Sequence, residues 1–177
     1  MNKLFILIPI IIVAVFIFAP KNKQKTIQVS ENNPVQTINS DAENAEKKEF
    51  SGEKGETIKL ENGLLNIDPR QFETNKVKFF NTILADGKTI YFLVLKDKEG
   101  NFRAAANANK QCAAFGKGYR QVGDEIECLT CNKKYPLSDF AVAQPDCNPF
   151  PINAKLPTKD GQIIINSTEL ESVASLF

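Results

Sequence analysis

The sequence has no histidine among its 177 residues, no tryptophan and only one methionine. Without histidine the chain cannot form a Ser-His-Asp triad, a Cys-His nucleophile, a histidine-ligated zinc enzyme or a histidine-bound haem. An ordinary Rieske centre is excluded too, because it needs two histidine ligands on one iron. The net charge of +1 gives no electrostatic case for nucleic acid binding. Since no nucleophile or acid–base pair stands out, we do not expect an enzyme.

Cysteine is also scarce, but all four cysteines fall in one stretch with the pattern C-x15-C-x2-C-x15-C: Cys112, Cys128, Cys131 and Cys147. A C-x2-C turn directs two thiolates toward one point, as a tetrahedral metal or an iron–sulfur cluster requires. The outer two cysteines would approach from separate loops and complete an all-cysteine site. We therefore predict that these four residues bind a metal or a cluster. A pair of structural disulfides stays open, since four cysteines allow three connectivities.

The N-terminus carries an unbroken apolar run, Leu4 to Ala19, which Lys3 precedes and further lysines follow. A spanning helix needs about 20 apolar residues, so the run is slightly short. No A-x-A cleavage site follows it, so we expect an uncleaved, single-pass transmembrane signal anchor over residues 1–20. The lysine count taken literally places the following domain in the cytoplasm. We nevertheless expect the soluble domain on the extracytoplasmic side. The small difference in lysine count does not decide the orientation.

Two further regions follow the anchor. Residues 21–56 are rich in Asn, Gln, Ser, Glu and Lys. Such a composition buries too little apolar surface to offset its ordering entropy, which predicts a disordered linker. Strand signals begin at Thr57, so residues 57–177 are expected to form the cysteine-containing soluble domain.

The soluble domain reads as a series of short strands. Val77–Leu84 and Thr89–Lys96 are rich in β-branched and aromatic residues and are joined by an Asp-Gly turn, which predicts a hairpin. A second hairpin is expected around Glu61-Asn62-Gly63, between Thr57–Leu60 and Leu64–Ile67. Further strands are expected at Phe102–Ala106, Gly118–Val122, Glu125–Cys128 and Gln162–Asn166.

A last short helix is expected from Thr168, with Glu171 completing a capping box. Its apolar side comprises Leu170, Val173, Ala174 and Phe177. The predicted fold class is therefore mainly β, a small β-sandwich or barrel with a short C-terminal helix. The strand aromatic residues are expected in its core: Phe79, Phe80, Tyr91 and Phe92.

Several motifs in this domain resemble those of the membrane iron–sulfur FtrD-like family. They occur in matching order and spacing at Lys117–Gln121, Gly123-Asp124, Cys128-x-x-Cys131 and Cys147-Asn148-Pro149-x-Pro151. Upstream stretches at Lys76–Phe80, Asp86–Lys88 and Tyr91–Val94 are similar as well. The resemblance covers roughly residues 57–177. It implies a membrane-bound protein whose cysteines bind an iron–sulfur cluster or metal.

The resemblance also implies a context. Proteins of this family accompany bacterial iron-uptake permease systems, in which an electron-transfer role is inferred. The expected partners are therefore the membrane and an iron permease or other redox components of such a system. The order of loops and strands is also similar to the Rieske fold, although the missing histidines restrict that likeness to the layout.

The sequence departs from the family pattern at one position. The family usually has a C-x2-C before its Lys-Gly-Tyr motif, whereas this chain reads Asn109-Lys110-Gln111-Cys112. Either Cys147 supplies the fourth ligand, or Asn109 or water completes the site, or the site has degenerated. Asparagine is a poor ligand for a soft metal, so Cys147 is favoured.

Three hypotheses for the cysteines follow from these patterns. An electron carrier with an iron–sulfur cluster is the first, and Lys117, Tyr119 and Arg120 would tune the cluster or dock a partner, or simply form an ordinary strand. A structural zinc site is the second, because four thiolates suit zinc equally well. A disulfide-stapled interaction module without a redox role is the third. The carboxylates of Asp124, Glu125 and Glu127 are expected to be solvated at a turn.

Overall fold

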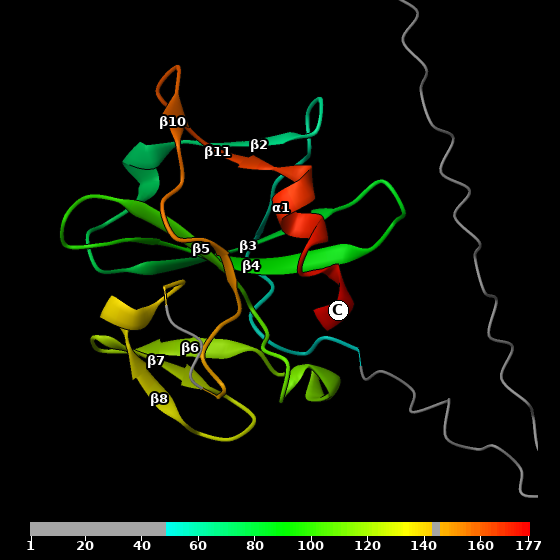
Figure 1. The fold of residues 1–177 in the computed structure, drawn as a ribbon, viewed down its shortest axis with the longest axis vertical. Coiled ribbons are helices and arrows are strands. Elements are labelled where there is room, and N and C mark those ends of the chain that lie inside the picture. The colour runs from blue at the N-terminus through cyan, green and yellow to red at the C-terminus, as the bar shows by residue number, and fades with distance from the viewer. Residues whose placement is uncertain (1–48, 143–145) are drawn as a thin grey trace, which may run out of the picture. The chain divides into compact units, whose positions relative to one another are not determined.

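The structure, a computed structural model, describes residues 49–142 and 146–177 (Figure 1). The predicted membrane anchor and most of the predicted linker lie outside these residues. In the part of the chain that is described, no helix has the length and apolar character to cross a membrane.

The centre of the domain is a five-stranded sheet in the order β1-β3-β4-β5-β9. Its strands are β1 (Glu56–Thr57), β3 (Val77–Ile83), β4 (Thr89–Lys96), β5 (Phe102–Ala106) and β9 (Pro151–Asn153). Strands β3 and β4 form the predicted antiparallel hairpin, in which Phe80 lies opposite Phe92. Strand β1 joins β3 in parallel at the edge of the sheet.

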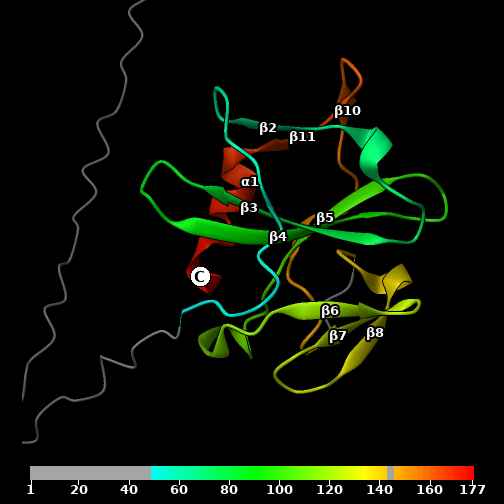
Figure 2. The same ribbon diagram turned by 180° about the vertical axis from the view of Figure 1, so that it is seen from behind.

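Two three-stranded sheets lie on either side of the central sheet (Figures 1 and 2). One comprises β10 (Thr158–Lys159), β11 (Gln162–Asn166) and β2 (Leu64–Ile67), and the helix α1 (Ser167–Glu171) follows it. The other, here called the cysteine sheet, comprises β6 (Tyr119–Val122), β7 (Glu125–Cys128) and β8 (Lys134–Pro136). Short 3-10 turns complete the elements: η1 (Pro69–Gln71), η2 (Ala113–Phe115), η3 (Leu137–Asp139) and η4 (Ala174–Leu176).

The central sheet is buried on both faces. On β4, Phe92 and Val94 belong to the apolar cluster under β2, β11 and α1, whereas Leu93 and Leu95 belong to a second cluster facing the cysteine sheet. Successive side chains of a strand point to opposite faces, so one apolar run supplies both clusters. The central sheet therefore packs against an apolar core on one face and against the cysteine sheet on the other.

The mainly β prediction with one short C-terminal helix is confirmed, but the described residues form three separate sheets and no closed barrel. A Rieske-like layout stays a prediction. The turn predicted at Glu61-Asn62-Gly63 is confirmed, since Glu61 and Leu64 exchange backbone hydrogen bonds of 2.8 and 3.0 Å across it. Residues 58–60 form no strand, so the predicted first arm of this hairpin is wrong. Strand β2 pairs instead with β11. That pairing buries Leu65 and Ile67 in the first cluster, which the local turn signal does not reveal.

Two boundaries also differ from the sequence prediction. Helix α1 begins at Ser167, and its capping box is formed by Asn166 and Glu169 rather than by Thr168 and Glu171. The backbone N–H of Asn166 donates to the Glu169 carboxylate at 2.8 Å. At the other end, Phe50 falls in the predicted linker, but its ring stacks on Tyr91 at 4.0 Å between centroids. The folded domain thus starts before residue 57, because the Phe50 ring packs against the ring of Tyr91.

Candidate metal centre

A hairpin turn of the cysteine sheet carries the C-x2-C motif. Cys128 is the last residue of β7, and Cys131 lies in the turn that leads to β8. The backbone N–H of Cys128 donates to the carbonyl of Lys133 at 2.9 Å, and that of Asn132 donates to the carbonyl of Cys128 at 2.8 Å. Asn132 adopts a φ of 58°, a left-handed conformation that asparagine tolerates well. The turn therefore has a defined backbone from which both thiols project.

Asn109 shapes the loop that carries Cys112. This loop follows β5, and the side-chain oxygen of Asn109 accepts hydrogen bonds from the backbone N–H groups of Gln111 and Cys112, each at 2.9 Å. Asparagine is suited to such local turns because its short side chain reaches its own backbone. Asn109 is 2% exposed, so the turn is fixed within the protein interior.

Two tyrosines hold the loop that carries Cys147. The Tyr119 hydroxyl, on β6, donates to the carbonyl of Cys147. The backbone N–H of Cys147 in turn donates to the Tyr135 hydroxyl, on β8, at 3.0 Å. Both rings are buried, with their polar tips on the same peptide segment. The cysteine sheet therefore positions Cys147 although this residue belongs to none of its strands.

These loops bring three thiols together. The Sγ atoms of Cys112, Cys131 and Cys147 all lie within 4.8 Å of one another. Those of Cys112 and Cys147 are 3.6 Å apart. Four sulfurs around one tetrahedral metal, each bonded at about 2.3 Å, are about 3.8 Å apart. All four cysteines are free thiols, so the structure holds none of the disulfides of the stapled-module hypothesis.

Cys128 lies beside this trio. Its Sγ is not within 4.8 Å of all three, although its thiol is near enough to act on the pKa values of both Cys112 and Cys131. It is buried, and the Asn109 side-chain nitrogen lies 3.8 Å from its Sγ. Of the four predicted ligands, the structure thus brings three into one tight group and sets the fourth next to them.

The orientation of Asn109 bears on the missing family cysteine. Because its oxygen accepts from two backbone N–H groups, its nitrogen must face the other way. That nitrogen lies within hydrogen-bond reach of the Cys128 sulfur, of the Tyr119 hydroxyl at 2.6 Å and of the Cys147 carbonyl at 3.3 Å. Asn109 therefore presents N–H donors to the site rather than a ligand atom. The Cys147 sulfur lies in the group of three thiols, and its role as the fourth ligand stays a prediction.

The thiols differ in their tendency to ionise. Burial raises the pKa of Cys112, and the thiol of Cys147 and the charge of Cys128 raise it further. Burial likewise raises the pKa of Cys147, together with the hydrogen bond to Cys131. Burial also acts to raise the pKa of Cys131, but hydrogen bonds from the Lys133 backbone and from the other three thiols outweigh it, so this pKa is lowered. The exposed Cys131 thus offers the site's most accessible thiolate.

The strand next to the site contains a paired carboxylate. Glu127 is buried rather than solvated, contrary to the sequence prediction, and its side chain is 7% exposed. It lies opposite Arg120 in the β6–β7 register, and the two side chains are 3.0 Å apart. Because Arg120 donates to it, the pKa of Glu127 is lowered. The pair links β6 and β7, so Arg120 acts within the cysteine sheet.

Sequence reasoning singled out Tyr119 but missed Tyr135 and the structural role of Asn109. Tyr135 follows the C-x2-C turn in the stretch Lys133-Lys134-Tyr135-Pro136. A tyrosine carries an apolar ring with a polar tip, so one placed next to a cysteine turn is a usable signal. Which peptide that tip reaches depends on the tertiary fold.

The comparisons with known proteins agree with this site. The model of the FtrD-like family, described as membrane iron-sulfur containing protein FtrD-like, matches residues 72–177. That range covers more than half of the chain and includes all four cysteines. Neither the curated proteins nor the solved structures give a significant match. The converging thiols and the family match lead to one conclusion: the chain belongs to the FtrD-like family of membrane iron–sulfur containing proteins.

Proposed function

We propose that this protein is a membrane-attached electron carrier that holds an iron–sulfur cluster through Cys112, Cys128, Cys131 and Cys147. The observation that carries the proposal is the group of three sulfurs within 4.8 Å, with Cys128 beside them, in a member of an iron–sulfur family. The donor set suits such a group, because iron–sulfur clusters are held by cysteine thiolates. When bound, a cluster would supply one-electron redox chemistry at this place.

The surrounding residues have the roles that such a carrier needs. The backbone of Cys147 is fixed by Tyr119 and Tyr135, and an N–H group of Asn109 faces the sulfur of Cys128. Hydrogen bonds to sulfur and burial are the means by which a protein sets the potential of a cluster. Cys131 is exposed, which supports exchange of electrons with a partner at the surface.

The proposed setting follows from the anchor and the family. Residues 1–20 would span the membrane once, and residues beyond them would tether the domain to it, with the domain on the extracytoplasmic side. The family name describes a membrane protein. We propose an iron permease or another redox component of a bacterial iron-uptake system as the partner, and an accessory rather than enzymatic role.

A structural zinc site is the second candidate, and one observation favours it. The 3.6 Å between the sulfurs of Cys112 and Cys147 is close to the edge of about 3.8 Å in a mononuclear tetrahedral site. Zinc would stabilise the loops without any redox change.

The test is the metal content of the full chain, purified without oxygen, together with its visible absorption spectrum. The electron-carrier proposal predicts iron, acid-labile sulfide and broad visible absorption. The variant Cys147→Ser is expected to lose the absorption, whereas Asp146→Asn should keep it, because Asp146 is an exposed neighbour paired with Lys133. A colourless protein with one zinc supports the second candidate. A colourless protein without metal contradicts both.

A further inference from the structure

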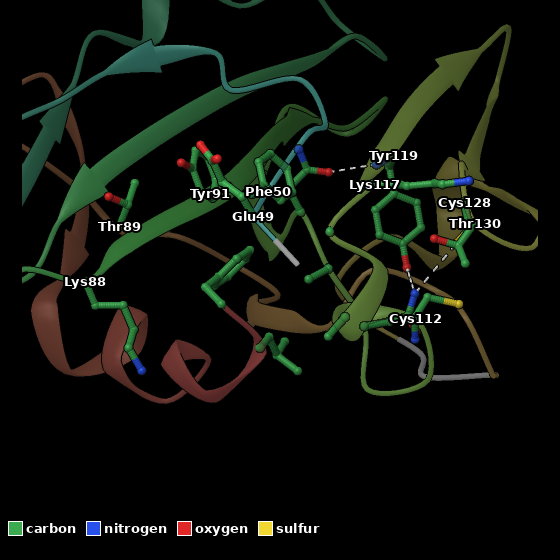
Figure 3. A pocket seen from close by; sticks show the side chains of 18 residues that line it. Glu49, Phe50, Lys88, Thr89, Tyr91, Cys112, Lys117, Tyr119, Cys128 and Thr130 are labelled. Carbon is green, nitrogen blue, oxygen red and sulfur yellow. Dashed lines mark hydrogen bonds between the residues drawn. The ribbon is translucent and has the colours of Figure 1, made fainter. Parts of the chain in front are cut away.

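A pocket of about 210 Å³ opens between the central sheet and the thiols. Phe50 and Tyr91 lie on one side of it, and Cys112, Cys128 and Thr130 lie on the other (Figure 3). Neither the family match nor the proposed metal centre assigns a role to this space. The residues that line the pocket indicate which class of ligand it would bind.

The first side of the pocket is built from aromatic rings. Phe50 stacks on Tyr91 with 4.0 Å between centroids and 14° between planes. The ring of Phe177 meets both of them edge-on, at 6.1 Å and 5.7 Å. Such surfaces bind flat rings by offset stacking and edge-to-face contact. The wall therefore favours a planar aromatic ligand over a branched aliphatic one.

The second side has a hydrogen-bonding group without a partner. The Oγ1 atom of Thr130 is buried and has no hydrogen-bond partner among the described residues. A buried hydroxyl that stays unpaired is unfavourable, so a ligand oxygen that accepts its hydrogen would remove that penalty. Thr130 lies between Cys128 and Cys131, so this oxygen would be held at the thiol site itself.

The charged residues of the pocket lie at its rim. Glu49 and Lys117 are exposed, and the Lys88 ammonium donates to the carbonyl of Ala174 at 3.2 Å. The interior is lined instead by aromatic rings, thiols and neutral amides. A charged group buried there would lack a counter-charge, so the part of the ligand inside the pocket is neutral.

We propose that this pocket binds a planar aromatic ring bearing carbonyl oxygens, the chemistry shared by quinone head groups and flavins. The ring lies against Tyr91, and one carbonyl accepts a hydrogen bond from Thr130. This goes beyond the proposed function, because binding of the ring depends on the pocket and not on which metal the thiols hold. It places a redox-active ring class directly beside the sulfurs of Cys112 and Cys128.

The test is binding of duroquinone, whose fully substituted ring has no open position for a thiol to add to, and, separately, of flavin mononucleotide to the full chain, with and without metal. Isotope labelling of the threonine methyl groups gives an NMR signal for each threonine. The signals of Thr130 and Thr89 report on the pocket, while that of Thr57, which does not line it, serves as a reference. Tight duroquinone binding identifies the source as a quinone, and tight flavin binding identifies it as a flavin. Either result supports the proposal, provided that the Thr130 signal shifts.

Two variants with matched controls make the test specific. Tyr91→Leu removes the stacking ring and Thr130→Val removes the hydroxyl, and each should weaken binding about two- to tenfold. Phe79→Leu and Thr82→Val make the same changes outside the pocket, and the Thr82 hydroxyl is also buried and unpaired among the described residues. Both controls should bind as the parent does.

Three results would overturn the proposal: neither probe binds, or the pocket variants bind as the parent does, or the controls lose affinity equally. Metal content is measured on the same samples. Loss of metal with normal ring binding would contradict the proposed function alone, and normal metal with no ring binding would contradict this inference alone.

Discussion

The two faces of the central sheet differ in how they are held. Toward β2, β11 and α1, the sheet packs an apolar cluster that includes Phe80, Phe92 and Leu65. Toward the cysteine sheet, apolar residues meet a buried polar network centred on Asn109 and Tyr119. The first face depends on volume and burial, whereas the second depends on hydrogen bonds between particular atoms. Substitutions on the first face should therefore lower mainly the stability of the fold, whereas those on the second should also weaken metal binding.

The largest effect is expected in the apolar cluster. Phe92 is fully buried and stacks on Phe80 at 5.6 Å between centroids. Phe92→Ala should lower the free energy of unfolding by about 3–5 kcal/mol, because it removes contacts and leaves a cavity. Denaturant unfolding measures the loss. Ile83→Ala, on the neighbouring strand and 57% exposed, is the control and should change stability little.

The molecules of Phe92→Ala that remain folded should bind metal as the parent does, since this face does not touch the thiols. A variant that kept its stability but lost metal would show that the two faces are not separate.

The next effect concerns Gly118, which precedes β6. Its φ is +66°, and an added Cβ would lie 2.6 Å from the side-chain oxygen of Asn107. That oxygen accepts the backbone N–H of Tyr119 at 2.9 Å. Gly118→Ala should therefore cost about 2–4 kcal/mol, from backbone strain and a disturbed hydrogen bond. It should also weaken metal binding, because Tyr119 holds the Cys147 loop.

Gly123→Ala is the matched control in the same sheet. Its φ of +62° imposes similar strain, but nothing lies within 4 Å of an added Cβ. It should cost only about 1–2 kcal/mol and leave metal affinity unchanged. Equal effects of the two alanines on metal affinity would contradict the role given to Tyr119.

A specific effect on metal binding is expected at Asn109, in addition to the stability cost of burying a carboxylate there. Asn109→Asp keeps the shape and the oxygen that closes the Cys112 turn, but it replaces the N–H donors by a negative charge near the thiolates. Metal affinity should fall about 10- to 100-fold, as for other residues that orient ligands. Competition with a chromophoric chelator measures it.

Asn66→Asp makes the same change at an exposed position of β2 and should leave metal affinity unaltered. An unchanged affinity in Asn109→Asp would show that the amide serves the loop alone.

The smallest expected effect concerns the pH at which each thiol ionises. In the metal-free, reduced protein, the lowered pKa of Cys131 means that its thiolate appears at a lower pH than those of Cys112 and Cys147, whose pKa values are raised. Alkylation followed by mass spectrometry should therefore modify Cys131 first, and the other two only as the pH rises. Faster modification of Cys112 or Cys147 would contradict the described ionisation order.

For the same reason, metal affinity should rise with pH, because binding requires Cys112 and Cys147 to release protons that their buried positions retain. A metal affinity that stays constant between neutral and alkaline pH would disagree with these raised pKa values.

The sequence predicted the two faces unequally. Strands such as Thr89–Lys96 could be located from their composition, and the β3–β4 hairpin from its Asp-Gly turn. The pairing of β2 with β11 could not, because it joins segments far apart in the chain. For the site, cysteine spacing named the four thiols. The hydrogen bonds of Asn109 and Tyr135 could not be predicted from the sequence, since they depend on which backbone segments the fold places beside these side chains.

The central claim is that thiols from three separate segments converge on one site, and cobalt titration of the metal-free full chain tests it most directly. The structure predicts saturation with the absorption of tetrahedral cobalt bound by several thiolates. Replacing Cys112, Cys131 or Cys147 by serine should weaken the sulfur-to-cobalt bands, because these three sulfurs lie within 4.8 Å of one another. Cobalt spectra without thiolate bands, or bands unchanged by all three substitutions, would contradict the account.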